Sequence, residues 1–150
     1  MNITPRHLGL LLALLLPAAL PAADLPKPDH EESALDDSMS SMNSAFRKLR
    51  RQVADPQQNP ASLALVAKLR AACEEATLGL PTKIARLPAK EQAAAKAAYV
   101  EKMQELITTV DKLATALKAD KNPEAAALIK ELTRLEEEGH KQFRTKKKDD

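Results

Sequence analysis

The chain has 150 residues, the length of a single domain, and a formal net charge of +2. Charges of both signs are interspersed along it, so nothing in the charge pattern indicates nucleic-acid binding. Its three aromatic residues (Phe46, Tyr99 and Phe143) are too few to form a stacking platform for bases.

The N-terminus has the parts of a secretory signal peptide. Arg6 precedes an apolar run from Leu8 to Leu16, and small residues follow as far as Ala23. This run is too short to cross ~30 Å of hydrocarbon as a helix, so we expect cleavage after Ala22 or Ala23 and no stable membrane insertion. The prediction is a periplasmic protein, with a signal peptide over 1–23, a flexible segment over 24–32, a folded domain over 33–145 and a charged tail over 146–150.

The folded region predicts four helices separated by prolines. The segments between the prolines are rich in Ala, Leu, Glu and Lys, which favour helix formation. Helix one should span residues 33–53, with Ser33 and Asp36 as a weak capping pair. Asn59-Pro60 is interpreted as the N-cap and first residue of helix two, and Asn122-Pro123 repeats this signal for helix four. Helix three should begin near Pro88.

Each segment carries one apolar stripe with a mean period near 3.5 residues, which predicts helices packed against one another. In chain order the four stripes are Leu35, Met39, Met42, Phe46, Leu49 and Val53; Leu63, Val66, Leu69, Cys73 and Ala76; Tyr99, Met103, Leu106, Val110, Leu113 and Leu117; and Leu128, Leu132, Leu135 and Phe143. Short connections favour antiparallel neighbours, so we expect an all-α, up-down-up-down four-helix bundle. Gly79 to Leu87 has the weakest pattern and is interpreted as a longer loop crossing one end.

Met39 and His140 should lie at the same end of this bundle. His140 is the only histidine in the folded region. At 1.5 Å per residue, both lie roughly 8 Å inside the end that holds the start of helix one and the end of helix four. A thioether and an imidazole at equal depth are a candidate pair of axial ligands for a haem. Alternatively, the methionine packs in the core and the histidine interacts with the helix dipole.

Gly139, just before this histidine, is the only glycine within the four expected helices. A glycine costs about 1 kcal/mol inside a helix. It would make room for a macrocycle, or it would reflect fraying near a helix end. Both interpretations remain open at this point.

Three segments resemble the cytochrome b562 family of exported haem proteins. Residues 35–39 (Leu-Asp-Asp-Ser-Met) resemble the start of these proteins, and residues 140–144 (His-Lys-Gln-Phe-Arg) resemble their end. Residues 69–72 (Leu-Arg-Ala-Ala) are similar to the family's second helix. The resemblance covers Leu35 to Arg144, which is nearly the whole chain after the signal peptide.

The resemblance implies that Met39 and His140 bind the iron of one haem b per chain. It also implies a pocket lined by Met42, Phe46, Leu69, Tyr99 and Met103, with Arg144 near the haem edge. Two positions depart from the family: Met103 stands where an aromatic residue is common, and Glu136 stands where a basic residue would suit a propionate. No Cys-x-x-Cys-His motif is present and Cys73 is the only cysteine, so we expect a non-covalent haem and a buried, inert thiol.

The function implied by the resemblance is electron transfer, because a haem with two protein ligands has no open coordination position. We therefore expect a soluble, monomeric carrier that is not an enzyme and that exchanges electrons with partners the sequence does not identify. The alternative is a cofactor-free exported bundle that acts as an interaction or chaperone-like protein. A di-iron carboxylate bundle is excluded because residues 137–140 supply only one of the two Glu-x-x-His motifs required.

Overall fold

A computed structural model describes the backbone from Pro28 to Thr145 and the side chains from Ala34 onward. The expected signal peptide (1–23), the first part of the expected flexible segment (24–27) and the charged tail (146–150) lie outside the described residues. So does the side chain of Ser33, which was expected to cap the first helix.

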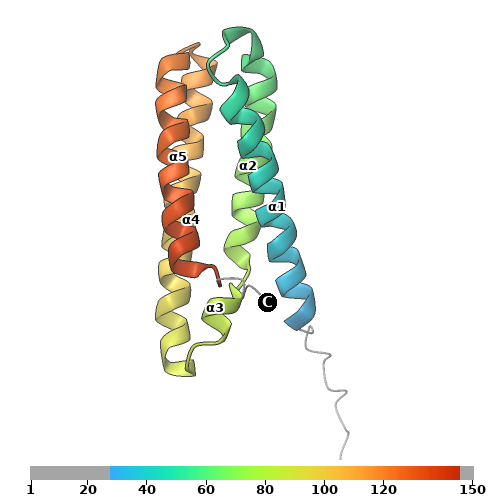
Figure 1. Ribbon diagram of the computed structural model, residues 1–150, viewed down its shortest axis with the longest axis vertical. Helices are drawn as coiled ribbons and strands as arrows, with labels where there is room; N and C mark the ends of the chain where they lie inside the picture. Colours follow the sequence, from blue (N-terminus) through green and yellow to red (C-terminus); the bar gives the residue numbers. More distant parts are fainter. Residues whose placement is uncertain (1–27, 146–150) are drawn as a thin grey trace, which may run out of the picture.

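The described part of the chain is helical and contains no strand, which confirms the all-α prediction (Figure 1). Four long helices carry the fold: α1 (Pro28–Gln52), α2 (Asn59–Leu78), α4 (Ala89–Lys118) and α5 (Asn122–Phe143). A 3₁₀ turn, η1 (Pro56–Gln58), joins α1 to α2, and a one-turn helix, α3 (Thr82–Ala85), joins α2 to α4.

The helices lie side by side, and the connections gather at two ends (Figure 1). The closed end, uppermost in the figure, holds η1 and the turn between α4 and α5; the open end holds α3 and the start of α1. Helix α1 packs along α2, α2 along α4, and α4 along α5, whereas α1 and α5 contact each other very little. The bundle is therefore loosely closed along one side, between its first and last helices.

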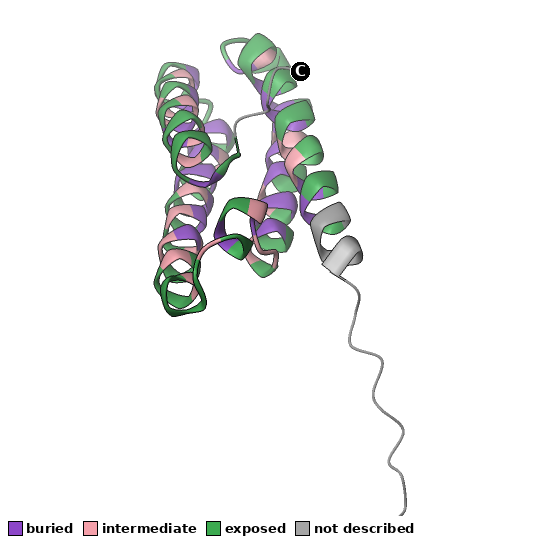
Figure 2. Cartoon of the chain, turned by 60° about the horizontal axis from the view of Figure 1, so that its bottom comes forward, coloured by how far each residue is buried: buried purple, intermediate pink, exposed green. Residues whose placement is uncertain are grey.

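The predicted apolar stripes form the core, with the buried faces turned toward the bundle axis (Figure 2). Leu49 and Leu113 are completely buried, and burial of such a side chain contributes about 1.5–3 kcal/mol. Five stripe residues are only half-buried and pack against the edge of this core: Met39, Met42, Leu63, Leu106 and Leu128. Two of these five, Met39 and Met42, belong to the predicted haem site.

Two predicted boundaries differ from the structure. Helix α1 begins at Pro28, before the expected start at Ser33, so residues 28–32 are helical and not a separate flexible segment. The stretch from Gly79 to Leu87, expected as a loop, contains α3. Ile84 explains this short helix, because it is the one α3 residue that is buried (2% exposed) and it anchors the turn to the core.

The prediction that Asn59 and Asn122 act as N-caps is wrong. Both are the first residues of their helices, and no side chain caps either start. Asn59 already has helical angles (φ −55°, ψ −41°) because η1 runs directly into α2. Its amide and that of Asn122 bond reciprocally at 2.8 and 3.2 Å, and Nδ2 of Asn122 also donates to the carbonyl of Val53 at 2.7 Å. The two buried asparagines thus connect the start of α2, the start of α5 and the residue that follows α1 at the closed end.

Candidate functional site

A cavity of about 460 Å³ lies between α1, α4 and α5 near the open end, with α3 at its border. This volume falls in the ordinary range for sites that bind a small molecule or cofactor. Its lining includes all eight residues that the sequence assigned to a haem site: Met39, Met42, Phe46, Leu69, Tyr99, Met103, His140 and Arg144. The fold therefore brings together residues that are up to about a hundred positions apart in the chain.

The two predicted ligands come from the two helices that barely contact each other. Met39 lies on α1 and is half-buried, while His140 lies in the last turns of α5 and is exposed. Within the described residues, the imidazole of His140 makes no hydrogen bond or ion pair. Its ring nitrogens are thus not committed to a neighbouring side chain, as ligation of a metal requires.

Tyr99 and Phe143 form a fixed aromatic part of the lining. Their rings meet edge to face, with centroids 5.3 Å apart and planes at 78°. The hydroxyl of Tyr99 donates to the carbonyl oxygen of Ala76 at 2.7 Å, which fixes the ring against α2. Burial raises the pKa of Tyr99 to about 12, so this wall is uncharged at physiological pH.

Cys73 is completely buried, as its place in the apolar stripe predicted. Burial raises the pKa of its thiol to about 12, and the nearby carboxylate of Glu74 acts in the same direction. Since the thiolate is the reactive form, this cysteine is a packing residue. It is not among the residues that line the cavity.

Arg50 bridges the two loosely packed helices on the side of the cavity that faces the closed end. Its guanidinium lies 4.7 Å from the centroid of the Phe46 ring, and Nη2 donates to Oγ1 of Thr133 on α5 at 2.7 Å. A cation over an aromatic face is favourable by about 0.5–1 kcal/mol at an exposed site. This bridge joins α1 to α5 next to the predicted pocket, because Phe46 also lines the cavity.

Charged groups of both signs border the cavity. Three cations line it, namely Lys83, Lys102 and Arg144, together with the carboxylates of Asp36 and Glu136. Lys102 is already paired with Glu105 at 2.7 Å and, more weakly, with Glu138 at 3.4 Å. Arg144 is exposed and makes no side-chain bond with any described residue, so it can approach an anionic group on a ligand.

Lys83 is a site residue that sequence reasoning missed. Its Nζ donates to the carbonyl oxygen of Gln142 at 2.6 Å and, at 3.4 Å, to that of Lys141. These carbonyls belong to the last turn of α5, where carbonyls lack helical partners and favour a cation. Lys83 therefore ties α3 to the turn that carries His140. Its position in a segment interpreted as loop gave no signal of this contact.

Gly139 lines the cavity beside the histidine. A Cβ atom at this position would have the Cγ of Lys102, at 4.0 Å, as its nearest neighbour, which is an ordinary contact. Gly79, by contrast, would place a Cβ only 3.1 Å from the Cβ and Cδ1 of Leu35. Close packing therefore explains the glycine at 79 but not the one at 139.

Among the side chains described, from Ala34 to Thr145, no group of three or more His, Cys, Asp or Glu is placed to hold a metal ion. None of the helices described is long and apolar enough to cross a membrane.

Residues 34–144 match the model of the cytochrome b562 family. The chain belongs to the cytochrome b562 family. No curated protein and no solved structure matches the chain significantly. Cytochromes b562 are haem b-binding electron carriers, typically periplasmic and not typically enzymes, so family membership gives the cavity a chemical context.

Proposed function

We propose that this protein is a monomeric periplasmic electron carrier that holds one haem b non-covalently, with Met39 and His140 as axial ligands. The proposed architecture is an antiparallel, up-down-up-down bundle whose open end houses the cofactor. One observation carries the proposal: a single cavity collects both candidate ligands and all six candidate pocket residues.

The lining of the cavity fits a haem. Its apolar side chains, among them Leu69, Met103 and Phe143, suit a flat macrocycle. The two candidate ligands come from α1 and α5 and line the same cavity, so they could hold a haem iron between them. Lys83 and Arg144 can attract propionates, whereas Glu136 opposes them.

When bound, haem b supplies a reversible one-electron couple at its iron. Met39 in place of a second histidine would raise the reduction potential, because a thioether ligand favours the reduced state. The buried pair of Tyr99 and Phe143 would exclude water from one side of the site and thereby raise the potential further. If Met39 and His140 both bind the iron, no coordination position on the iron would be left for a substrate.

The position of the only cysteine supports non-covalent attachment. Thioether attachment needs cysteines at the cofactor edge, and Cys73 is buried in the core. Export is supported by the apolar run from Leu8 to Leu16 in the sequence.

A titration with haem tests the proposal. The chain from Asp24 onward, purified without haem, should bind one equivalent and develop a sharp Soret band, with low-spin spectra in both oxidation states. A reaction with iodoacetamide on the unfolded, haem-extracted protein should modify Cys73, because the thiol stays free. Failure to bind haem tightly at any ratio would favour the cofactor-free bundle.

A further inference from the structure

We propose that the open end carries a docking surface for an acidic patch on a redox partner protein. We name this surface the basic face and define it by six exposed cations: Lys83, Arg86, Lys90, Lys96, Lys141 and Arg144. It spans α3, the first turns of α4 and the end of α5. The proposal rests on the proposed function, because it assigns the kind of partner to the same site.

The basic face has a strong excess of positive charge. Residues 79–98 and 139–145 contain these six cations and a single carboxylate, Glu91. The closed end has no such excess: residues 54–60 and 118–124 contain two lysines against three carboxylates. The positive excess is confined to this part of the open end, because carboxylates lie beside it at the start of α1 (Asp36 and Asp37) and on α5 (residues 136–138).

The cations of the basic face are not neutralised by the protein itself. Elsewhere in the bundle, Arg70, Lys102 and Arg134 each form ion pairs with carboxylates. Across the described side chains, no cation of the basic face forms an ion pair, and Lys83 contacts only main-chain carbonyls. Uncompensated charge of this kind attracts and orients an oppositely charged partner during diffusion.

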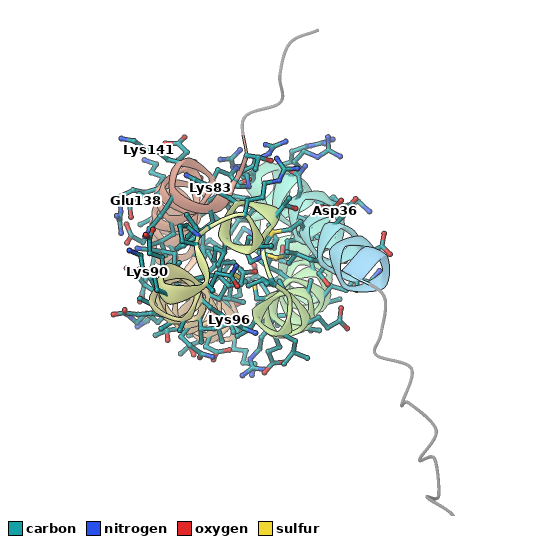
Figure 3. All side chains as sticks on the ribbon, turned by 90° about the horizontal axis from the view of Figure 1, so that it is seen from below. Asp36, Lys83, Lys90, Lys96, Glu138 and Lys141 are labelled. Carbon is teal, nitrogen blue, oxygen red and sulfur yellow. The ribbon has the colours of Figure 1, made fainter. Side chains whose placement is uncertain are left out.

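The basic face lies at the border of the proposed cofactor site. Lys83 and Arg144 belong to both the face and the cavity lining. Seen from the open end, Lys83, Lys90, Lys96 and Lys141 lie over α3, α4 and α5, with Asp36 on the α1 side (Figure 3). A partner seated here would therefore lie at the border of the proposed cofactor site.

The pattern of charge favours a protein over a membrane surface. Carboxylates interrupt or border the basic face: Glu91 lies within it, Asp36 lies across the open end, and Glu138 lies beside Lys141 (Figure 3). A uniformly anionic lipid surface would meet these carboxylates with repulsion. A protein patch of mixed charge can match them and so fix one orientation.

The first test is a titration of the ¹⁵N-labelled chain with an acidic [2Fe–2S] ferredoxin, followed by NMR and done with and without haem. At low salt, amide shifts should concentrate in residues 82–98 and 139–145 and disappear at 0.5 M NaCl. The double variant Lys90→Glu/Lys96→Glu should weaken binding by about tenfold or more. Shifts spread evenly over the bundle, or binding unchanged in this variant, would overturn the proposal.

The matched control is Lys112→Glu/Lys130→Glu, which makes the same change in net charge. Both lysines are exposed on α4 and α5, outside the basic face. This control should retain near-normal binding; an equal loss in both variants would mean that only net charge matters. Preferential binding to phosphatidylglycerol vesicles over the ferredoxin would contradict the choice of a protein partner.

A kinetic measurement separates this proposal from the proposed function. Reduced, haem-loaded protein should transfer one electron to hexacyanoferrate(III), giving hexacyanoferrate(II) and oxidised protein. The Lys90→Glu/Lys96→Glu variant should do so several-fold more slowly at low ionic strength, with an unchanged absorption spectrum. A normal rate in this variant would contradict the docking surface but not the proposed function. Failure of the unsubstituted protein to bind haem would contradict the proposed function. The NMR test on the haem-free chain would then still decide whether the docking surface exists.

Discussion

The two ends of this bundle differ in how their helices pack: the closed end is held by buried hydrogen bonds, and the open end contains a cavity. The closed end buries two asparagine amides and satisfies both, with Asn122 bonded to Val53 and Asn59, and Asn59 bonded also to Asp120 at 2.8 Å. The open end instead holds a cavity of about 460 Å³ between helices that barely contact each other. One end fixes the helices in register, and the other leaves room for a ligand.

The difference shows where the stability and the proposed function of the molecule reside. A buried, fully bonded polar pair specifies one arrangement of the helices, because any other arrangement leaves amides without partners. A cavity gives up packing contacts that its lining residues would otherwise make. We therefore expect substitutions at the closed end to affect stability with or without haem, and those at the open end to affect mainly haem binding.

The largest expected effect on stability is at the closed end. Asn122→Ala would remove the donor to the Val53 carbonyl and leave Asn59 without its amide partner. Unsatisfied buried polar groups cost about 1–3 kcal/mol each, so the free energy of unfolding should fall by about 2–3 kcal/mol. Urea unfolding of the haem-free chain measures this. The exposed amide variant Gln104→Ala should change stability by less than about 0.5 kcal/mol, and an equal loss there would remove the special role of the asparagine pair.

An intermediate effect is expected at the contact between α3 and α5. Lys83→Met would remove the cation from the carbonyls at the end of α5, at a cost of about 0.5–1 kcal/mol for an exposed group. Because the same turn carries His140, the haem dissociation constant should rise several-fold, as measured by transfer of haem to apomyoglobin. Lys83→Arg should restore most of the affinity, and Lys90→Met should leave it unchanged. If both methionine variants lose affinity equally, the loss comes from charge and not from the contact.

The smallest effect compares the two glycines of the open end. Gly139→Ala should raise the unfolding free energy of the haem-free chain by about 0.5 kcal/mol, because alanine favours the helix. Gly79→Ala should not stabilise it, since the new Cβ would meet Leu35 at 3.1 Å. Haem titration then distinguishes the two interpretations of Gly139. Weaker binding by Gly139→Ala would indicate room for the macrocycle, and unchanged binding would indicate a glycine near a frayed helix end.

Long-range periodicity made most of the fold predictable from the sequence. The stripes that include Leu49, Val66, Val110 and Leu132 determine which helix faces are buried, and proline positions separate the helices. The local details were less predictable. Asn59-Pro60 has the composition of a helix cap, but η1 enters α2 without a break, and the amide finds its partner on another helix. Ile84 is one of a few scattered apolar residues between Gly79 and Leu87, and this stretch is too short and irregular to predict α3.

The candidate site was predictable only in part. The matched depth of Met39 and His140 follows from helix geometry, and the resemblance at both ends of the chain supplied their proposed role. The contact of Lys83 with main-chain carbonyls cannot be predicted from the sequence, because a lysine that makes this contact and one that faces solvent are the same residue in the same kind of segment. Arg50 and Thr133 give no signal in the sequence either, because their hydrogen bond joins residues 83 positions apart.

The most direct test of the central claim is the visible absorption spectrum of the haem-loaded protein in both oxidation states, compared with Met39→Ala, His140→Ala and the matched variant Met42→Ala. Met42 lines the same cavity but is not a proposed ligand. We predict that the wild type and Met42→Ala give low-spin spectra. Met39→Ala should shift to a high-spin form with a lower reduction potential, and His140→Ala should lose the sharp Soret band. Identical spectra for all four proteins would contradict the assignment of Met39 and His140 as iron ligands.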